Sequence, residues 1–160
     1  FNFKTFNSLI NNFLKKHNSR IIFEPGRSII GNSGILISKI IYIKKNKNKN
    51  FIILDAAMND FMRKALYGAN HQIIPSIKNG RILHKKFEFV GPICESTDKF
   101  LTLNKFQLLK EQDLIIICDV GAYGMSLASN YNVRPLPAEI LVKNSSAQII
   151  RNRQKLSDLI

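Results

Sequence analysis

A series of short apolar runs after Gly34 constrains the fold of this chain more than any other feature. Each run is rich in β-branched and aromatic residues and is bounded by polar or turn-forming residues, a pattern typical of the strands of an antiparallel β-barrel or sandwich. The helix-like stretch Asn59–Ala69, "NDFMRKALYGA", interrupts them. The runs lie at residues 34–44, 51–56, 71–77, 87–93, 113–119, 138–143 and 147–151.

Two polar segments between these runs predict the ends of β-hairpins. The segment "KKNKNKN", Lys44–Asn50, separates two apolar runs and is predicted to be a solvated hairpin end. The segment "KNSSA", Lys143–Ala147, is predicted to be a second hairpin turn between the last two runs.

The residues before Gly34 follow a different pattern. Apolar residues recur at helical spacing and predict an amphipathic helix over Thr5–His17. A predicted strand, Ile21–Phe23, follows and ends at the turn Glu24–Arg27, "EPGR". One helix and one strand leave their apolar faces without packing partners, so the rest of this α/β layer must come from other chain. We therefore predict a domain boundary near Ser33, with a terminal α/β unit in residues 1–33 and a β domain in residues 34–160.

Composition narrows the class of protein further. The chain has 160 residues, of which 45% are hydrophobic, which favours a globular fold. The apolar runs are strand-sized and too short to cross a bilayer, and the N-terminal residues lack the features of a signal peptide, so no membrane partner is expected. Cys94 and Cys118 show neither a disulfide framework nor metal-ligand spacing. A reducing cytoplasmic location and the absence of a metal site are predicted.

The charge raises the alternative of nucleic-acid binding. The formal net charge is +13, from 24 basic and 11 acidic residues. However, Asn and Ile are abundant together with Lys, as expected from a compositional bias, and aromatic residues do not alternate with the basic ones as in RNA-binding surfaces. We interpret the charge as compositional and expect no nucleic-acid partner.

Four ordered motifs resemble the C-terminal half of the diaminopimelate decarboxylase family. They are "FEPGRSIIGNSGILISKI", "DAAMNDFMRKALYGANHQI", "VGPICESTD" and "GAYGMSLASNYNVRP". These enzymes depend on pyridoxal 5'-phosphate and belong to the alanine-racemase-like fold family. The resemblance implies that residues 1–33 contain the last helix and strand of a (β/α)8 barrel. It also implies cytoplasmic homodimers with shared active sites, which convert meso-2,6-diaminopimelate to L-lysine and CO2.

The same resemblance implies the residues that bind the cofactor. The turn that follows a barrel strand exposes backbone N–H groups suited to a phosphate. By resemblance, this turn lies against the phosphate of pyridoxal 5'-phosphate, and Tyr123 in "GAYG" contacts the cofactor and the substrate. The residues of the turn are Glu24, Pro25, Gly26 and Arg27.

The resemblance also implies a clamp for the end of the substrate that does not react. That end carries a carboxylate and an ammonium group. Arg27 and Arg63 are expected to bind the carboxylate, because a guanidinium group matches its geometry. Tyr67 is expected to donate a hydrogen bond, and Glu95 to accept the ammonium.

Cys94 is the expected catalytic residue. Taken alone, a cysteine after "VGPI" is most often a small buried hydrophobic residue. By resemblance, it is the acid that protonates the substrate Cα after CO2 leaves, and it reaches the cofactor of the partner subunit. Cys118, within "LIIIC", is expected in the core.

Other positions depart from the family pattern or carry no assigned chemistry. Thr97 and Lys64 replace the usual Gly and Pro and are expected to loosen loops near the site. His71 and Asp60 are interpreted as structural, and residues 129–135 as a hydrogen-bonded support. No lysine lies in the context of the one that forms the Schiff base, so this chain alone is expected to be inactive. The alternative is a non-catalytic dimerisation fragment of a related decarboxylase.

Overall fold

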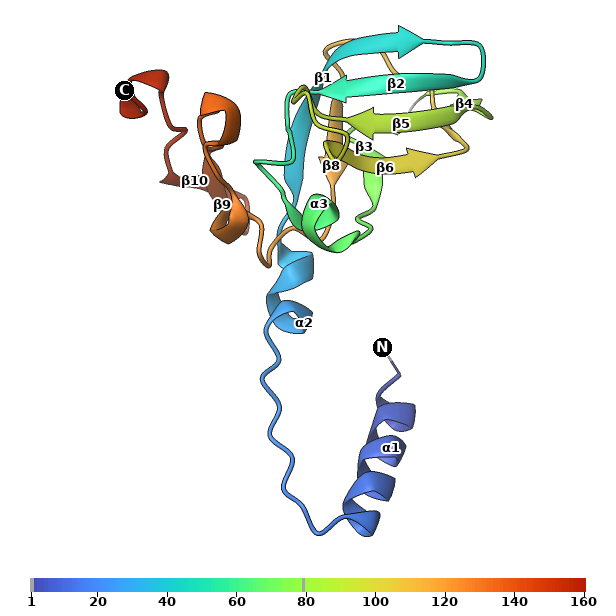
Figure 1. Cartoon of the computed structure of the whole chain (residues 1–160), viewed down its shortest axis with the longest axis vertical. Helices are drawn as coiled ribbons and strands as arrows, with labels where there is room; N and C mark the ends of the chain where they lie inside the picture. Colours follow the sequence, from blue (N-terminus) through green and yellow to red (C-terminus); the bar gives the residue numbers. More distant parts are fainter. Residues whose placement is uncertain (1, 79) are drawn as a thin grey trace.

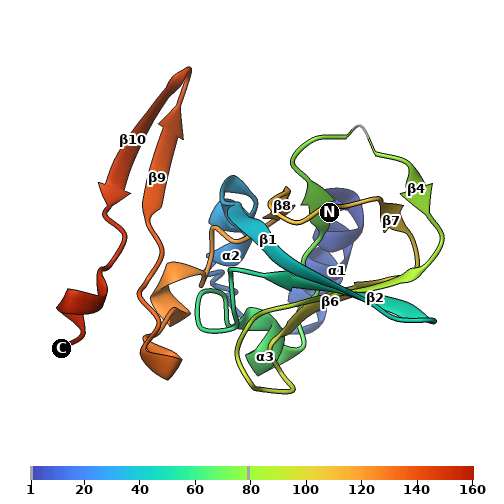
Figure 2. The same ribbon diagram turned by 90° about the horizontal axis from the view of Figure 1, so that it is seen from above.

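The fold is built around one curled, mainly antiparallel β-sheet, seen in the computed structural model in Figures 1 and 2. The structure describes residues 2–78 and 80–160. The strand order in the sheet is β3-β8-β1-β2-β5-β6. These strands are β1 (Leu36–Lys45), β2 (Lys49–Leu54), β3 (Ile73–Pro75), β5 (Lys86–Val90), β6 (Lys99–Leu103) and β8 (Leu114–Ile117). The prediction of a mainly β fold is confirmed.

One strand pair departs from the predicted antiparallel arrangement. Strands β2 and β5 pair in parallel, with Ile52 opposite Phe89. Parallel neighbours need a long crossover connection, and residues 55–85 provide it. This crossover contains α3 (Arg63–Tyr67), β3 and β4 (Ile82–Leu83). All other strand pairs are antiparallel, including the small pair of β4 with β7 (Phe106–Gln107).

The core is built mainly from apolar side chains of the sheet strands. The ring of Phe106, from β7, lies 5.1 Å from the ring of Phe89 and 6.1 Å from that of Phe87. In β2 the burial alternates along the strand, as expected for a sheet with one covered face. The main buried apolar residues are Ile40, Ile52, Leu54, Phe61, Phe87, Phe89, Ile115 and Ile117.

The predicted N-terminal helix is present, but the predicted strand after it is not. Helix α1 (Phe3–Lys16) begins after Asn2, whose side chain accepts from the Thr5 amide at 3.1 Å, and it contains no buried residue. Residues 18–26 form no helix or strand. A strand requires a neighbour to share its backbone hydrogen bonds, and the described residues place none beside Ile21–Phe23. Figure 1 shows this segment as an extended link between α1 and α2 (Arg27–Ile30).

The C-terminal hairpin is separate from the main sheet. Strands β9 (Glu139–Lys143) and β10 (Ser146–Arg151) pair only with each other. Figure 2 shows this hairpin standing beside the sheet. Both predicted hairpin turns are confirmed. One joins β9 to β10, and the other joins β1 to β2. No helix in the described part of the chain has the length and hydropathy needed to cross a membrane.

The predicted helix over residues 59–69 is shorter than expected. Residues 58–60 form a turn, and α3 ends at Gly68, whose φ of 64° lies in the left-handed region that favours glycine. Lys64 Nζ donates to the Gly68 carbonyl at 3.3 Å and to Asn70 Oδ1 at 2.7 Å. Lys64 therefore ties the end of α3 down instead of loosening it. The short 3-10 helices are η1 (Gly31–Ser33), η2 (Met125–Leu127), η3 (Tyr131–Val133) and η4 (Leu156–Asp158).

Neighbouring isoleucines in β1 offer a test of this core. The side chain of Ile40 is fully buried, whereas Ile41 is 40% exposed. We predict that Ile40→Ala lowers the free energy of unfolding by about 2–5 kcal/mol, because it leaves a cavity. The matched control Ile41→Ala is expected to cost less than about 1 kcal/mol. Urea unfolding measures both, and equal losses would contradict the assignment of the buried face.

Candidate active site

A polar turn directly after β2 anchors the loops around the candidate site. We call residues 55–60 the hub segment. Its successive backbone N–H groups at Ala56, Ala57 and Met58 donate to Ser38 Oγ (3.1 Å), Asp60 Oδ2 (2.8 Å) and Asp98 Oδ1 (2.7 Å). Buried backbone groups require such partners. Ser38 and Asp98 lie in other parts of the chain, so these hydrogen bonds hold those parts against the hub segment.

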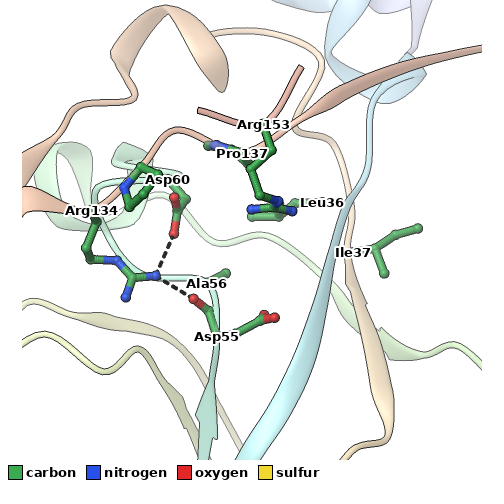
Figure 3. Close-up of a pocket in the computed structure, with 9 residues that line it drawn as sticks. Leu36, Ile37, Asp55, Ala56, Asp60, Arg134, Pro137 and Arg153 are labelled. Carbon is green, nitrogen blue, oxygen red and sulfur yellow. Dashed lines mark hydrogen bonds and ion pairs between the residues drawn. The ribbon is translucent and has the colours of Figure 1, made fainter. Parts of the chain in front are cut away.

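Arg134 clamps the hub segment from the C-terminal side. Its Nε donates to Asn59 Oδ1 at 3.0 Å and its Nη2 to the Asp55 carbonyl at 2.6 Å. Nη2 also pairs with Asp60 Oδ2 at 3.4 Å (Figure 3). Burial raises the pKa of the Asp60 carboxyl, although the Ala57 N–H and Arg134 oppose this shift. A small cavity of about 140 Å³ lies beside this clamp and is also lined by Arg153.

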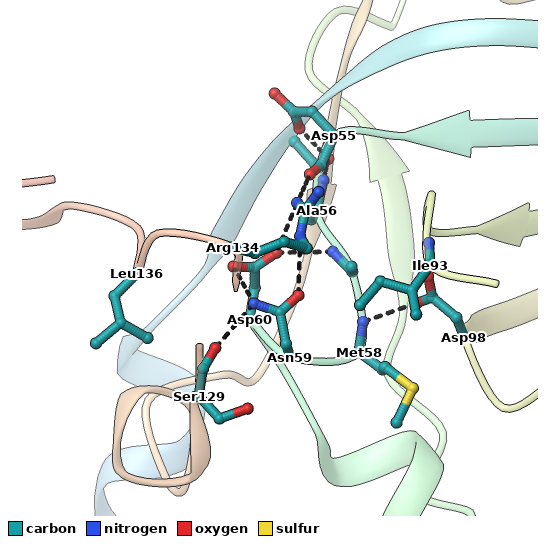
Figure 4. A network of polar contacts seen from close by, with 12 residues as sticks. Asp55, Ala56, Met58, Asn59, Asp60, Ile93, Asp98, Ser129, Arg134 and Leu136 are labelled. Carbon is teal, nitrogen blue, oxygen red and sulfur yellow. Dashed lines mark hydrogen bonds and ion pairs between the residues drawn. The ribbon is translucent and has the colours of Figure 1, made fainter. Parts of the chain in front are cut away.

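The loop that carries Cys94 and Glu95 is held by one buried carboxylate. Asp98 accepts from the Ile93 amide at 2.8 Å as well as from Met58 of the hub segment (Figure 4). The side chain of Asp98 leaves no space for a Cβ at Gly91, so the loop closes tightly on itself. Burial raises the pKa of Asp98, and its two backbone donors oppose the shift. Cys94 is exposed at the outer end of this loop.

Residues 129–135 dock on the hub segment and reach the same loop. Asn59 forms two hydrogen bonds with the backbone of Ser129. Its side-chain Nδ2 donates to the Ser129 carbonyl at 3.0 Å, and its backbone carbonyl accepts from the Ser129 amide at 2.9 Å. Two residues later, the Tyr131 hydroxyl donates to Glu95 Oε1 at 2.5 Å. The prediction that residues 129–135 form a hydrogen-bonded support is confirmed.

The two predicted arginines line one cleft of about 410 Å³. The guanidinium carbon of Arg63 lies 5.6 Å from the ring centroids of both Tyr67 and Tyr123, so these three predicted residues form one cluster. The Nε atom of Arg63 is buried and has no hydrogen-bond partner in the described chain. The cleft is lined by Arg27, Ser28, Gly31, Asn32, Arg63, Ala69, Asn70, His71 and Asp119.

The turn "EPGR" borders this cleft. Glu24, Pro25 and Gly26 are exposed, and α2 begins at Arg27. A Cβ at Gly26 would lie 3.9 Å from the Tyr123 hydroxyl, which places the turn beside that ring. The backbone N–H groups at residues 26–28 donate to no acceptor in the described residues, as expected at the start of a helix. They are therefore free to bind an anion.

The structure brings only part of the predicted site together. Arg27 and Arg63 line the cleft, and Tyr67 and Tyr123 contact Arg63 without being among the lining residues. Cys94, Glu95 and lysines are also not among the residues that line the cleft. The predicted residues therefore form two groups, one at the cleft and one on the loop of residues 91–98.

The structure agrees with the predictions for some of the remaining residues and differs for others. His71 is buried, with Nδ1 bonded to the Cys118 carbonyl at 3.0 Å, and Asp60 is buried in the hub segment, in agreement with structural roles. Cys118 is only half-buried, not in the core as predicted, because it lies just past the end of β8. Thr97 hydrogen-bonds to the Met58 sulfur at 3.5 Å, which supports its loop instead of loosening it.

Sequence reasoning gave no individual roles to four residues that build the site, although residues 129–135 were predicted to be a hydrogen-bonded support. The four residues are Asn59, Asp98, Tyr131 and Arg134. All four stand inside the quoted motifs, so their positions carried a signal. Their partners lie up to 79 residues away in the chain, and such contacts cannot be derived from local spacing.

A family model and similar known proteins lead to the same family of proteins. Residues 27–121 match the family described as pyridoxal-dependent decarboxylase, C-terminal sheet domain. The chain is 43% identical over 157 residues to diaminopimelate decarboxylase from Zymomonas mobilis, covering 98% of this chain and 37% of that protein. The chain thus spans about a third of the length of the curated relatives that it matches.

Solved structures show the same similarity. Diaminopimelate decarboxylase from M. jannaschii in complex with L-lysine superposes with a TM-score of 0.84 at 35% identity, covering 96% of this chain and 36% of that one. The Helicobacter pylori enzyme with L-lysine gives a TM-score of 0.80 at 45% identity, covering 94% and 36%.

The pKa shifts of the buried carboxyls predict opposite effects of pH on the stability of the fold. The raised pKa of Asp60 and Asp98 means that their contribution to stability is greatest below their ordinary value of 3.8 and is lost as pH rises through the folded value. For Glu88, burial acts to raise the pKa, but Lys49, Lys99 and Lys86 lower it overall, at ion-pair distances of 3.3–3.5 Å. Its stabilising contribution is therefore present above 4.5 and is lost as pH falls through the folded value.

Carboxyl carbon NMR across a pH titration measures these shifts directly. We expect titration midpoints above 3.8 for Asp60 and Asp98 and below 4.5 for Glu88. A midpoint for Asp98 below 3.8 would show that its two hydrogen bonds outweigh its burial.

Proposed function

The chain belongs to the pyridoxal-dependent decarboxylases, through their C-terminal sheet domain, and from this premise we propose that it is the C-terminal part of a diaminopimelate decarboxylase. The reaction is the conversion of meso-2,6-diaminopimelate to L-lysine and CO2. The observation that carries the proposal is the cleft in which two arginines from separate motifs meet. The names of the relatives support the choice of substrate.

The cleft suits one carboxylate of an amino acid. Arg27 and Arg63 supply two positive charges, and the unpartnered buried Nε of Arg63 needs an acceptor. We assign both arginines to the carboxylate that remains on the substrate. Binding the departing carboxylate tightly would stabilise the ground state and oppose its release as neutral CO2. Tyr67 and Tyr123, which contact Arg63, are proposed to bind the same ligand.

The turn before α2 suits the phosphate of pyridoxal 5'-phosphate. Its free backbone N–H groups and the neighbouring side chains of Arg27 and Tyr123 form an anion-binding edge. When bound, the cofactor withdraws the electron pair left on Cα as CO2 departs. Because no lysine lines the cleft, covalent attachment of the cofactor is not assigned to any described residue.

Cys94 is proposed to donate the proton that replaces CO2. The Cα–carboxylate bond breaks, the thiol proton moves to Cα, and solvent then reprotonates the thiolate. Exposure of the thiol on its outer loop agrees with transfer to a ligand held by another surface. Glu95, one residue later, is proposed to accept the distal ammonium.

We propose that two copies of the chain share each active site. Cys94 and Glu95 are not among the residues that line the arginine cleft of their own chain, and Cys94 is exposed, which supports a cleft supplied by a partner subunit. The two free cysteines agree with a reducing cytoplasmic location, which is also part of the proposal.

Mixing of inactive variants tests both the activity and the sharing. In the complete decarboxylase that carries this chain, Cys94→Ala and Arg63→Ala are each expected to abolish decarboxylation of meso-diaminopimelate. Dimers reassembled from an equal mixture should recover about a quarter of the wild-type activity, because half are mixed and each mixed dimer has one intact site of two.

Two outcomes would contradict the proposal. A mixture that stays inactive, although mass spectrometry shows mixed dimers, would place Cys94 and Arg63 in the same subunit's site. A wild-type enzyme that prefers ornithine or arginine to meso-diaminopimelate would refute the assigned substrate.

A further inference from the structure

The hydrogen bond between Tyr131 and Glu95 joins the supporting segment 129–135 to the proposed ammonium acceptor. The Tyr131 hydroxyl donates to Glu95 Oε1 at 2.5 Å and leaves Oε2 without a hydrogen-bond donor in the described residues. No basic side chain in residues 2–78 and 80–160 forms an ion pair with Glu95. Within the described residues, the Glu95 side chain is thus held by a neutral donor and has no ion-pair partner.

The loop that carries Glu95 is also held by hydrogen bonds that do not involve Tyr131. Asp98 already fixes that loop through the amides of Ile93 and Met58. The Glu95 amide is also bonded, to the Ile93 carbonyl at 2.8 Å. With the backbone held independently, the contact with Tyr131 acts on the orientation of the Glu95 side chain.

The turn that presents Tyr131 is anchored at both ends. On one side, Ser129 is bonded to Asn59 of the hub segment. On the other side, Asn130 Nδ2 donates to the Arg134 carbonyl at 2.8 Å and to Gln154 Oε1 at 2.6 Å. The turn therefore has a defined position relative to the loop of Glu95.

The same turn contains unfavourable backbone conformations. Asn132 and Val133 both have φ of 56°, in the left-handed region. Asparagine tolerates this region, but a β-branched residue such as valine rarely adopts it. Such conformations persist where the surrounding structure imposes them, and they concentrate at functional sites. Here the imposed turn directs the Tyr131 hydroxyl to Glu95.

We propose that Tyr131 is a positioning residue that orients Glu95 to bind the distal ammonium group of the substrate. This inference rests on the function proposed above. A neutral phenol suits the task, because a lysine or arginine at this position would neutralise Glu95 and repel the ammonium. Tyr131 thereby sets the preference for substrates with a second amino group.

A pair of substrates tests this role in the complete decarboxylase. The first is meso-diaminopimelate, and the second is 2-aminopimelate, which keeps both carboxylates but lacks the distal amino group. We expect Tyr131→Phe to lower kcat/KM for diaminopimelate roughly tenfold, as for loss of a hydrogen bond to a charged group. The value for 2-aminopimelate should not change. Tyr42→Phe, on the exposed part of β1, is the matched control and should change neither value.

The variant Glu95→Gln separates failure of this inference from failure of the proposed function. If Glu95→Gln keeps the preference for diaminopimelate, the proposed role of Glu95 is wrong. If Glu95→Gln loses that preference while Tyr131→Phe retains it, Tyr131 is not the positioning residue and the proposed function stands. Equal slowing of both substrates by Tyr131→Phe would show a merely structural role and overturn the inference.

A measurement independent of activity tests the contact itself. The hydrogen bond from Tyr131 and the negative charge of Glu95 raise the pKa of the phenol. In tyrosine ζ-carbon NMR of the same enzyme, one tyrosine should therefore titrate above its ordinary value of 10.0, and Glu95→Gln should lower that midpoint. A midpoint unaffected by Glu95→Gln would show that the two side chains do not interact and would overturn the inference.

Discussion

The hub segment, residues 55–60, is the constraint on which the candidate site depends. The chain leaves the buried strand β2 here and turns towards α3, so its backbone N–H groups need acceptors that water cannot supply. Side chains from three other regions bond to the backbone of the hub segment. Ser38 from β1 and Asp98 from the loop of Cys94 accept from its N–H groups, and Arg134 from the segment of Tyr131 donates to its Asp55 carbonyl. The free energy that favours satisfied backbone groups therefore also sets the positions of the loops that carry the proposed chemistry.

The proposed site consists of two separate surfaces. The arginine cleft is lined by residues of α2 and α3, and Tyr123, from the chain that follows β8, contacts Arg63. The loop of Cys94 and Glu95 faces outward elsewhere. The proposal that two copies share each site joins the exposed Cys94 of one chain with the arginine cleft of the other. Each surface is held by interactions within its own chain.

Local patterns predicted the elements better than their arrangement. Apolar runs such as "LIIIC" identified strands because a half-buried sheet requires them. In "KFLTL", polar residues stand at the first and fourth positions, and β6 was missed. The parallel pairing of β2 with β5 depends on a long crossover that periodicity does not encode. Likewise, Arg27 and Arg63 were identified by their motifs, whereas the contacts of Arg134 with Asn59 and Asp60 arise only from tertiary packing.

Hydrogen exchange of Arg134→Lys tests the central role of the hub segment most directly. Lysine keeps the positive charge near Asp60 but loses the planar pair of donors that clamps Asn59 and the Asp55 carbonyl. We expect faster amide exchange in residues 91–98 and 129–135, with β1 and β8 unchanged. Arg153→Lys, which alters the neighbouring cavity, is the control and should leave both loops as they are. Unchanged exchange in residues 91–98 of Arg134→Lys would contradict the account, because the two loops would then be held independently of each other.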